Sequence, residues 1–246
     1  DLRSSVVSKA KAVGYTPTSS VASKAVVDVL VNNAFGASIT MTAGTKFTTT
    51  VNDQSFSFVN KSNVTITPVD GVYKFSDLDI FEGSYLNYKY TASTSDLEQR
   101  FIIPNNNVDT STLTVKVQNS SSDTTTNTYT LADGLTGLTP TSQVYFLQEV
   151  ENGRYEVYFG DGVLGKAIAD GNIVIFDYIN CNQDAPNNAT TFTLSGTIGG
   201  FSDATITTIS NSTGGSVPES ISSIKYNAPR DYASQDRAVT AEDYKV

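Results

Sequence analysis

Short segments in which apolar and polar residues alternate recur along the chain from Lys24 onward. In KAVVDVLV, the first of them, Val27, Val29 and Val31 stand at every second position. A period of two is typical of a β-strand with one buried face, and turn residues separate the segments. About a dozen such segments predict a mainly β (α+β) fold of short, mostly antiparallel strands. The others include SFSFVN, NVTITPV, LNYKYTAS, QRFIIP, TLTVKVQN, SQVYFLQEV, RYEVYFG, GNIVIFDYI, TTFTLSG and ATITTIS.

Two stretches depart from this alternation and predict helices. Near the start, apolar residues lie at helical spacing, and Gly14 follows them as a C-terminal cap. Near the end, Ser216-Val-Pro-Glu219 is a capping-box pattern with proline in the first turn, which predicts a short helix over roughly residues 217–226. Pro229 is expected to end that helix. The apolar residues of the first helix are Leu2, Val6, Val7, Ala10 and Val13.

The formal net charge of −9 is unevenly spread. The first 24 residues are basic, and an acidic body follows them. An acidic body repels phosphate backbones and anionic lipid headgroups. We therefore expect no nucleic-acid partner and no membrane partner. The chain also has no run of about 18 apolar residues that could span a bilayer.

Histidine is absent, which removes the commonest general base and metal ligand and excludes Ser-His-Asp and Cys-His catalysis. Cys181, the one cysteine, cannot form an internal disulfide or a thiolate zinc site. Asp77, Asp79 and Glu82 could hold calcium, although their spacing lacks the glycine and terminal glutamate of an EF-hand loop, and an exposed acidic turn explains them more simply. We expect no catalytic residue, no metal and no cofactor.

GDGVLG is a literal G-x-G-x-x-G made by Gly160, Asp161, Gly162 and Gly165. A dinucleotide site needs a helix to open at the third glycine. Only about six residues separate Gly165 from the turn signal at Gly171, too few for a crossover helix. The segment therefore predicts a β-hairpin whose glycines permit positive φ or close packing.

The tail APRDYASQDRAVTAEDY resembles a segment of the phage baseplate J-like family. In that family a proline-bearing connection precedes Arg-Ala-Val-Thr, two further residues and Asp-Tyr. The matching residues here are Ala228, Pro229, Arg237, Ala238, Val239, Thr240, Asp243 and Tyr244.

Three landmarks of the same family stand upstream in the same order. One is a GDG hairpin, a second is a Gly-Gly pair followed by an acidic residue that opens a short helix, and a third is an Arg-bearing helix followed by Gly-Tyr. The residues are Gly160, Asp161 and Gly162 with Gly165 and Lys166 for the first; Gly214, Gly215 and Glu219 for the second; and Arg3, Gly14 and Tyr15 for the third.

Within this family the chain is most similar to the baseplate wedge subunits of T-even-like contractile-tail bacteriophages. The resemblance implies a structural virion protein without enzymatic activity, assembled in the host cytoplasm. It also implies pairing with copies of itself and joining with other wedge proteins in a ring around the central hub.

The resemblance and the patterns together predict three parts. Residues 1–21 form an N-terminal helix and linker, residues 22–213 a β-rich domain, and residues 214–246 a hinge, a short helix and the start of a C-terminal α/β domain. The chain lacks an initiator methionine and stops soon after a second capping-box pattern at Thr240, so we expect the middle piece of a longer polypeptide. Gly214, Gly215 and Pro229 are candidate hinge elements when the tail contracts.

Two other functions stay open from the sequence. A surface adhesin or carbohydrate-binding module would use the tyrosines of the LNYKY region, and a glycosidase would use a pair of carboxylates, although the chain has no tryptophan to stack a sugar. The candidate residues are Tyr85, Tyr88 and Tyr90 for the first function, and Glu149 with Glu156 or Asp161 for the second.

Overall fold

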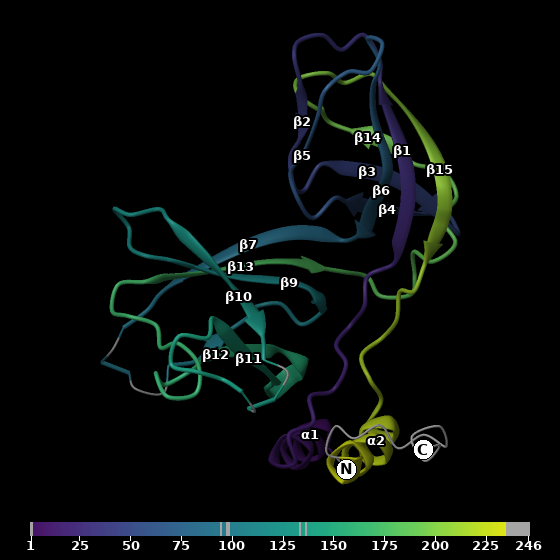
Figure 1. Ribbon diagram of the computed structural model, residues 1–246. Helices are drawn as coiled ribbons and strands as arrows, with labels where there is room; N and C mark the ends of the chain where they lie inside the picture. The colour runs from purple at the N-terminus through teal and green to yellow at the C-terminus, as the bar shows by residue number, and fades with distance from the viewer. Residues whose placement is uncertain (1, 94, 97–98, 133, 136, 235–246) are drawn as a thin grey trace, which may run out of the picture.

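The computed structural model describes residues 2–93, 95–96, 99–132, 134–135 and 137–234 as a mainly β protein with a helix near each end of this range (Figure 1). The mainly β class predicted from the alternation is therefore confirmed. The helices are α1 (Arg3–Ala12) and α2 (Ile221–Ser234), with one 3-10 turn, η1 (Glu151–Gly153).

One antiparallel sheet of six strands forms the upper part of the molecule in Figure 1. In spatial order its strands are β14 (Thr193–Ser195), β3 (Lys46–Val51), β4 (Gln54–Val59), β6 (Tyr73–Glu82), β1 (Lys24–Val31) and β15 (Ala204–Thr213). In β1, Ala25, Val27, Val29 and Val31 are buried and the residues between them are half-buried, as the alternation predicts. A separate pair, β2 (Ile39–Met41) and β5 (Val64–Ile66), packs on the same core.

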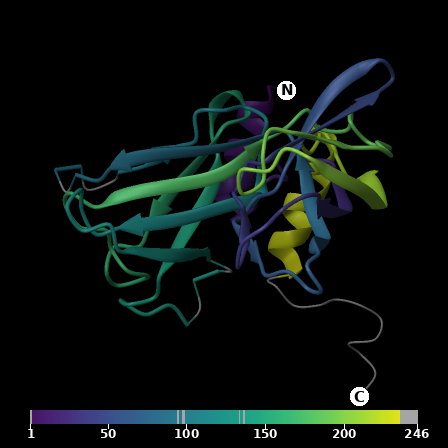
Figure 2. The same ribbon diagram turned by 90° about the horizontal axis from the view of Figure 1, so that it is seen from above.

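A second sheet of seven strands lies below and beside the first (Figures 1 and 2). Its order is β7 (Ser84–Thr91), β13 (Ile173–Asn180), β9 (Val108–Gln118), β10 (Thr126–Leu131), β11 (Val144–Glu149), β12 (Tyr155–Phe159) and β8 (Phe101–Ile102). Adjacent strands of this sheet are antiparallel, except for β10 and β11, which are parallel. The two edge strands meet where Tyr90 on β7 packs edge-on against Phe101 on β8, so the sheet curls into a nearly closed barrel.

The chain crosses from the first sheet to the second at Glu82 and Gly83. The Glu82 carboxylate is fully buried and accepts hydrogen bonds from the backbone N–H and side-chain amide of Asn182, both at 2.7 Å. Burial raises the pKa of this carboxyl, although the Asn182 bonds act in the opposite direction. The Gly83 N–H donates to the Ser57 carbonyl at 2.8 Å, so the crossing is held to both sheets.

Helices α1 and α2 lie side by side at one end of the molecule, where the extensions of β1 and β15 bring them together (Figure 1). An antiparallel bridge between Val21 and Ser216 joins those two extensions. The helices share a small core of Val6, Val7, Ala10, Ile224 and Ala228. Leu2, which the spacing placed on the buried face, is instead exposed.

The end of α1 follows the prediction from Gly14. This glycine has φ +83°, its N–H donates to the Lys11 carbonyl, and the Tyr15 N–H donates to the Ala10 carbonyl, both at 3.0 Å. These two bonds satisfy carbonyl groups that the last helical turn leaves free, as in a Schellman motif.

Helix α2 differs from its prediction at both ends. It begins at Ile221 because the hydroxyl of Ser220, not Ser216, accepts the capping bond from the Ser223 N–H at 3.1 Å. It continues through Pro229 to Ser234, so the prediction that Pro229 ends the helix is wrong. Proline forfeits one backbone bond; the α2 residues buried against α1, Ile224 and Ala228, lie just before it, and residues 230–233 after it are exposed.

Candidate functional site

Arg3 connects α1 to the second sheet and to the segment before α2. Its Nε and Nη2 atoms donate to the two carboxylate oxygens of Glu149 at 2.6 and 2.8 Å, and its Nη1 donates to the Glu219 carbonyl at 2.5 Å. Glu149, the last residue of β11, is only 4% exposed. The bond to Glu149 is the main factor that raises the pKa of the Arg3 guanidinium. A two-pronged arginine–carboxylate pair fixes orientation as well as distance.

Glu219 collects the other bonds of this region. Its carboxylate accepts the Tyr15 hydroxyl at 2.9 Å, the Thr18 N–H at 3.2 Å, the Ser223 hydroxyl at 2.6 Å and the Asn227 amide at 2.9 Å. Partial burial and the neighbouring carboxylate raise the pKa of Tyr15 to about 12. One acidic side chain therefore ties the linker after α1 to the first turns of α2.

We call Arg3, Tyr15, Glu149 and Glu219 the helix joint. The structure thus brings together three residues predicted from the family resemblance, although they lie far apart in the sequence. A cavity of about 610 Å³ lies beside the joint, with Arg3, Glu149 and Glu219 among its lining residues. Tyr155 also lines it and donates from its hydroxyl to the Pro17 carbonyl at 2.9 Å. The arrangement joins structural elements, with the Arg3 guanidinium held between the Glu149 carboxylate and the Glu219 carbonyl.

The joint should lose stability in acid. Partial burial tends to raise the pKa of Glu219, but the bonds from Ser223, Asn227, Tyr15 and Thr18 outweigh it and lower the pKa below 4.5. An acid with a lowered folded-state pKa contributes stability that is present above its unfolded pKa and is lost as the pH falls through the folded pKa. We expect thermal unfolding from about pH 5 down to about pH 2 to show a steeper loss of stability in the wild type than in Glu219→Gln. Parallel curves for the two proteins would contradict this.

Of the glycine pair after β15, Gly215 is packed against the body and Gly214 is exposed. Gly214 has φ +82°, and a Cβ on Gly215 would lie 2.2 Å from the Gln183 carbonyl oxygen. The Gly215 N–H donates to the Asn187 side chain at 3.0 Å, and its carbonyl accepts from the same side chain at 2.9 Å. A hinge at this pair stays a prediction, and such a motion would have to break the Asn187 bonds.

The remaining predicted residues of the tail lie outside the described part of the chain. They are Arg237, Thr240, Asp243 and Tyr244. Pro229 lies within α2, on the groove between the two helices.

The backbone N–H groups of the GDGVLG loop form hydrogen bonds within the loop itself. No helix follows Gly165, as predicted. The Asp161 carboxylate accepts the N–H groups of Val163 and Leu164, both at 2.9 Å, and the Gly162 N–H donates to the Gly165 carbonyl at 3.0 Å. Amides that could cradle a phosphate are therefore already bonded within the loop.

The predicted β-hairpin at this loop is wrong. The strands on either side, β12 and β13, belong to one sheet but are separated in it by β11, β10 and β9. The loop instead returns the chain across the barrel, and its glycines serve close packing. A Cβ on Gly160 would lie 2.3 Å from the Leu164 carbonyl oxygen, and Gly165 has φ +91°.

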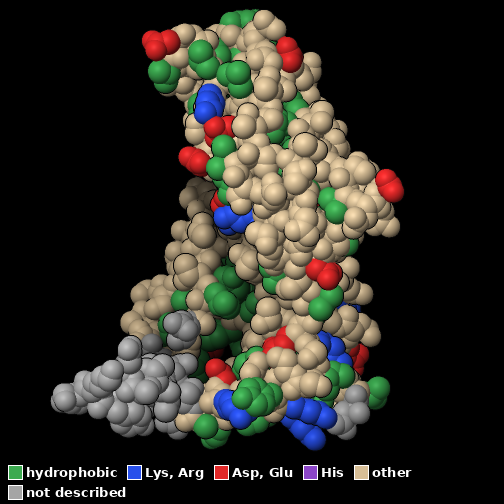
Figure 3. All heavy atoms as spheres, turned by 90° about the vertical axis from the view of Figure 1, so that its right-hand side faces the viewer, with side chains coloured by type: hydrophobic (Ala, Val, Ile, Leu, Met, Phe, Trp, Pro, Cys, Tyr) green, Lys and Arg blue, Asp and Glu red, His purple; other side chains and the backbone are tan. Residues whose placement is uncertain are grey.

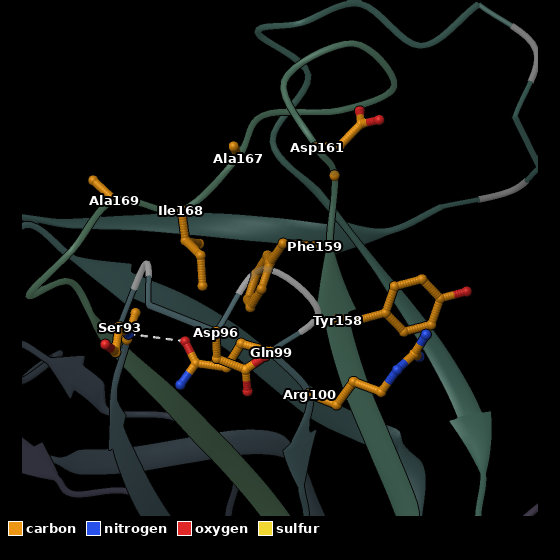
Figure 4. Close-up of a pocket in the computed structure, with 12 residues that line it drawn as sticks. Ser93, Asp96, Gln99, Arg100, Tyr158, Phe159, Asp161, Ala167, Ile168 and Ala169 are labelled. Atoms are coloured by element: carbon orange, nitrogen blue, oxygen red, sulfur yellow. Dashed lines mark hydrogen bonds between the residues drawn. The ribbon is translucent and has the colours of Figure 1, made fainter.

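A second cavity, of about 560 Å³, lies beside this loop (Figure 4). Arg100 reaches into it beneath the Tyr158 ring, with the guanidinium carbon 4.6 Å from the ring centroid. Arg100 also pairs with Glu156 at 3.2 Å. On the opposite wall, the Ser93 backbone N–H donates a hydrogen bond to the side-chain oxygen of Gln99 at 2.9 Å. The pocket is lined by two carboxylates, Asp96 and Asp161, but the Asp161 carboxylate is already bonded to its own loop, and neither Glu149 nor Glu156 lines the pocket.

The residues predicted for a glycosidase and for a carbohydrate-binding module do not come together in the structure. Glu149 lies opposite Tyr155 and Glu156 opposite Gln148 in the β11–β12 ladder, so these two adjacent cross-strand positions place their carboxylates on opposite faces. Alternation likewise places Tyr85 on the face opposite to Tyr88 and Tyr90, so the three tyrosines form no single platform.

The acidic residues of β6 do not converge either. Asp77 and Asp79 are exposed, Glu82 is buried at the crossing, and Asp79 pairs with Lys24 at 2.8 Å. Within the described residues no cluster of three or more potential ligand side chains could hold a metal ion. In the same residues neither helix is long and apolar enough to cross a bilayer.

Sequence reasoning missed much of what makes the joint. The sequence offers Glu149 only as one of a catalytic pair, and it gives no signal for Ser223 and Asn227, which bond to Glu219. A single buried acid at a strand end beside a basic helix is a weak signal, because the pairing partner lies 146 residues away.

Comparison with known proteins identifies the part of the chain that forms most of the second sheet. Residues 88–190 match the family model of the third domain of the bacteriophage baseplate wedge protein gp6. The baseplate wedge protein gp6 of Enterobacteria phage T4 is 26% identical over 270 aligned residues, which cover 99% of this chain and 40% of that protein. The chain thus spans about 40% of the length of the curated relative that it matches.

A solved structure is also similar in part. The cryo-EM structure of the anti-feeding prophage baseplate, six-fold symmetrised, contains a chain that is 12% identical, with a TM-score of 0.32. The match covers 95% of this chain and 42% of that one.

The curated relative is a baseplate wedge protein, and the aligned part of this chain includes both helices and both sheets. The resemblance to the wedge subunits inferred from the landmark residues is therefore confirmed. The chain is thus similar to bacteriophage baseplate wedge proteins, through the domain model over residues 88–190 and through the curated relative over almost its whole length.

Proposed function

We propose that the chain links neighbouring wedges of a contractile-tail baseplate into a ring around the central hub. It would do so by contacts with copies of itself and with other wedge proteins, and this role needs no catalysis. The helix joint carries the proposal, because it fixes α1 and α2 to the barrel through buried and multiply bonded side chains. A force applied at the helices would therefore pass to the β body and would not be absorbed by a loose linker.

Charge supports contacts at the helix end. Lys9, Lys11 and Arg230 are exposed on the two helices, whereas the chain as a whole carries −9. Figure 3 shows several Lys and Arg side chains at the lower end of the molecule, with a few acidic side chains among them, and further acidic side chains over the body above. A basic end complements the acidic body of a neighbouring copy, and several modest contacts around a ring reinforce one another through effective concentration.

Amine-reactive cross-linking of purified phage tails, followed by mass spectrometry, tests this role. We expect Lys9 and Lys11 of the full-length subunit to be cross-linked to other copies of it or to neighbouring baseplate proteins. Lys61, which is exposed in the loop after β4 of the first sheet, is the internal reference for lysine reactivity. Cross-links from Lys9 and Lys11 that stay within one chain would contradict contacts at the helix end.

The ring itself needs a separate observation. Tails assembled without the full-length subunit should show no closed baseplate ring by electron microscopy. Complete rings in its absence would refute the linking role, whatever the cross-links show.

A further inference from the structure

A groove of about 440 Å³ runs between α1 and α2, which lie side by side (Figure 1). Its floor is the small core that the two helices share, and apolar side chains make up most of its lining. Its rims are exposed or half-buried, and they include Lys9 and Val13 on α1 and Lys225, Pro229 and Tyr232 on α2. The two helices by themselves therefore leave apolar surface open beside their core.

The helix pair is also small for a unit of this kind. Helix α1 has ten residues and α2 has fourteen, and only five buried side chains form the core between them. Helices of this length are marginal in water and depend on tertiary packing for their stability. Tyr232 nevertheless leaves 60% of its surface exposed on the rim of the groove. A third apolar segment laid along the groove would cover this ring and stabilise both helices.

The chain itself supplies such a segment within reach. Helix α2 ends at Ser234, close to the rim residue Tyr232. The capping-box pattern from Thr240 to Asp243 predicts that a new helix begins after Thr240. The connection between the two, residues 235–239, is five residues long. Connections of about 2–8 residues join helices that pack as antiparallel neighbours, so the new helix is expected to lie against α2.

The sequence after Thr240 has one apolar face. In AEDYKV, Ala241 and Tyr244 stand three residues apart, which places them on the same side of a helix. Glu242 and Asp243 point away from that side, and both lie in the first turn, where a helix favours negative charge. A small residue followed one turn later by an aromatic ring suits a groove with an apolar floor.

Charge favours the same placement. The groove is lined by Lys9 and Lys225, and none of its described lining residues is acidic. The first turn of the new helix carries Glu242 and Asp243. Opposite charges on the rim and on the incoming helix fix its orientation more than they add to affinity.

We propose that the helix that begins after Thr240 packs antiparallel to α2 in the groove between α1 and α2, with Tyr244 as its anchor. Thr240 and Asp243 cap this helix, and Tyr244 covers the apolar floor beside Tyr232. The landmark residues of the tail thus act as a docking segment. The resulting cluster of three helices joins the chain that enters α1 to the chain that leaves α2, and it is independent of the ring-linking role.

Tryptophan fluorescence tests the docking on the 246-residue chain, which has no tryptophan of its own. Tyr244→Trp places a single fluorophore on the docking face, and Glu242→Trp, on the other side of the same helix, is the matched control. We expect acrylamide to quench the Tyr244→Trp fluorophore at least threefold less than the Glu242→Trp fluorophore. Equal quenching of the two would show that the apolar face is not buried and would overturn the proposal.

A second substitution in the Tyr244→Trp chain locates the docking. Tyr232 and Tyr226 are 60% and 59% exposed on α2, but only Tyr232 lines the groove. Tyr232→Asp should raise the quenching at least twofold, whereas Tyr226→Asp should leave it unchanged. The proposal does not survive if both substitutions act equally or if neither acts. Circular dichroism establishes that the helices and sheets persist, and Tyr232→Ala takes the place of Tyr232→Asp if they do not.

Dilution distinguishes docking within one chain from docking between copies. The Tyr244→Trp fluorophore should stay equally protected over a fiftyfold dilution, because the segment and the groove belong to the same chain. Protection that disappears on dilution would assign the groove to the segment of a second copy, and it would overturn the proposal.

Discussion

Gly83→Ala is expected to lower the free energy of unfolding by about 4 kcal/mol, the sum of a positive-φ penalty and an overpacking penalty. Gly83 has φ +124°, and a Cβ there would lie 2.3 Å from the Asn180 carbonyl oxygen and 2.9 Å from a methyl carbon of Ile179. The clash is with backbone, which cannot rotate away. The Gly83 N–H is bonded to Ser57 and the neighbouring Ser84 pairs with Asn180, so neither side of the contact is free to shift.

Chemical denaturation measures this effect, and Gly71→Ala is the matched control. Gly71 also has a positive φ, +78°, but a Cβ there meets nothing within 4 Å. We expect that variant to lose only about 1 kcal/mol, from backbone strain alone. Equal losses at the two positions would show that the crossing between the sheets tolerates a side chain, and that the packing at Asn180 is not what requires the glycine.

Arg3→Ala is expected to lower the free energy of opening of α1 by about 3 kcal/mol, because it leaves the buried Glu149 carboxylate without its partner. Glu149 is only 4% exposed, and both of its oxygens accept from Arg3. The same substitution removes the bond to the Glu219 carbonyl. Because α1 contacts the rest of the chain mainly through α2 and the joint, the loss should appear as local undocking, which native-state hydrogen exchange of the α1 amides measures.

Two further variants show whether the geometry of the pair or its charge matters. Lys11→Ala removes a cation on the same helix that lies 3.8 Å from Glu156 and is half exposed, and it should cost less than about 1 kcal/mol. Arg3→Lys keeps the charge but cannot bond both oxygens of Glu149 and the Glu219 carbonyl in one plane, so it should fall between the wild type and Arg3→Ala. If Arg3→Ala and Lys11→Ala have the same small effect, the joint does not hold α1 in place.

These two predictions concern the two connections through which load would cross the molecule. Gly83 lies where the two sheets join, and Arg3 lies where the helices join the second sheet. If the proposed linking role is correct, both variants in the full-length subunit should reduce the yield of complete baseplates. Gly71→Ala, at an exposed turn, should not.

Local patterns predicted the strands well, because alternation reports directly on a face that must be buried. Val27, Val29 and Val31 are buried in β1 as their spacing indicated. The absence of a helix after Gly165 followed from chain length alone, since too few residues separate the turn signals. The helix at the start and its glycine cap were also local, because Gly14 acts on carbonyls within its own last turn.

Long-range contacts decided the rest. The order of strands places β12 and β13 in one sheet without pairing them, and no local signal distinguishes that from a hairpin. Helix α2 continues through Pro229, although proline lacks the N–H of that turn and local propensity predicts an end there. No local pattern marks Gly83, because the need for glycine at this position comes from the carbonyl of Asn180, almost a hundred residues away.

The sequence by itself therefore determined the class of fold, the local turns and the landmark residues that relate the chain to baseplate wedge proteins. Only the tertiary structure decided that Arg3, Tyr15 and Glu219 meet one another and Glu149, and that α1 and α2 leave an apolar groove between them. The physical reason is the range of the interactions. Periodicity and backbone conformation depend on neighbours a few residues apart, whereas ion pairs, cross-sheet contacts and grooves between helices depend on where distant segments come to lie.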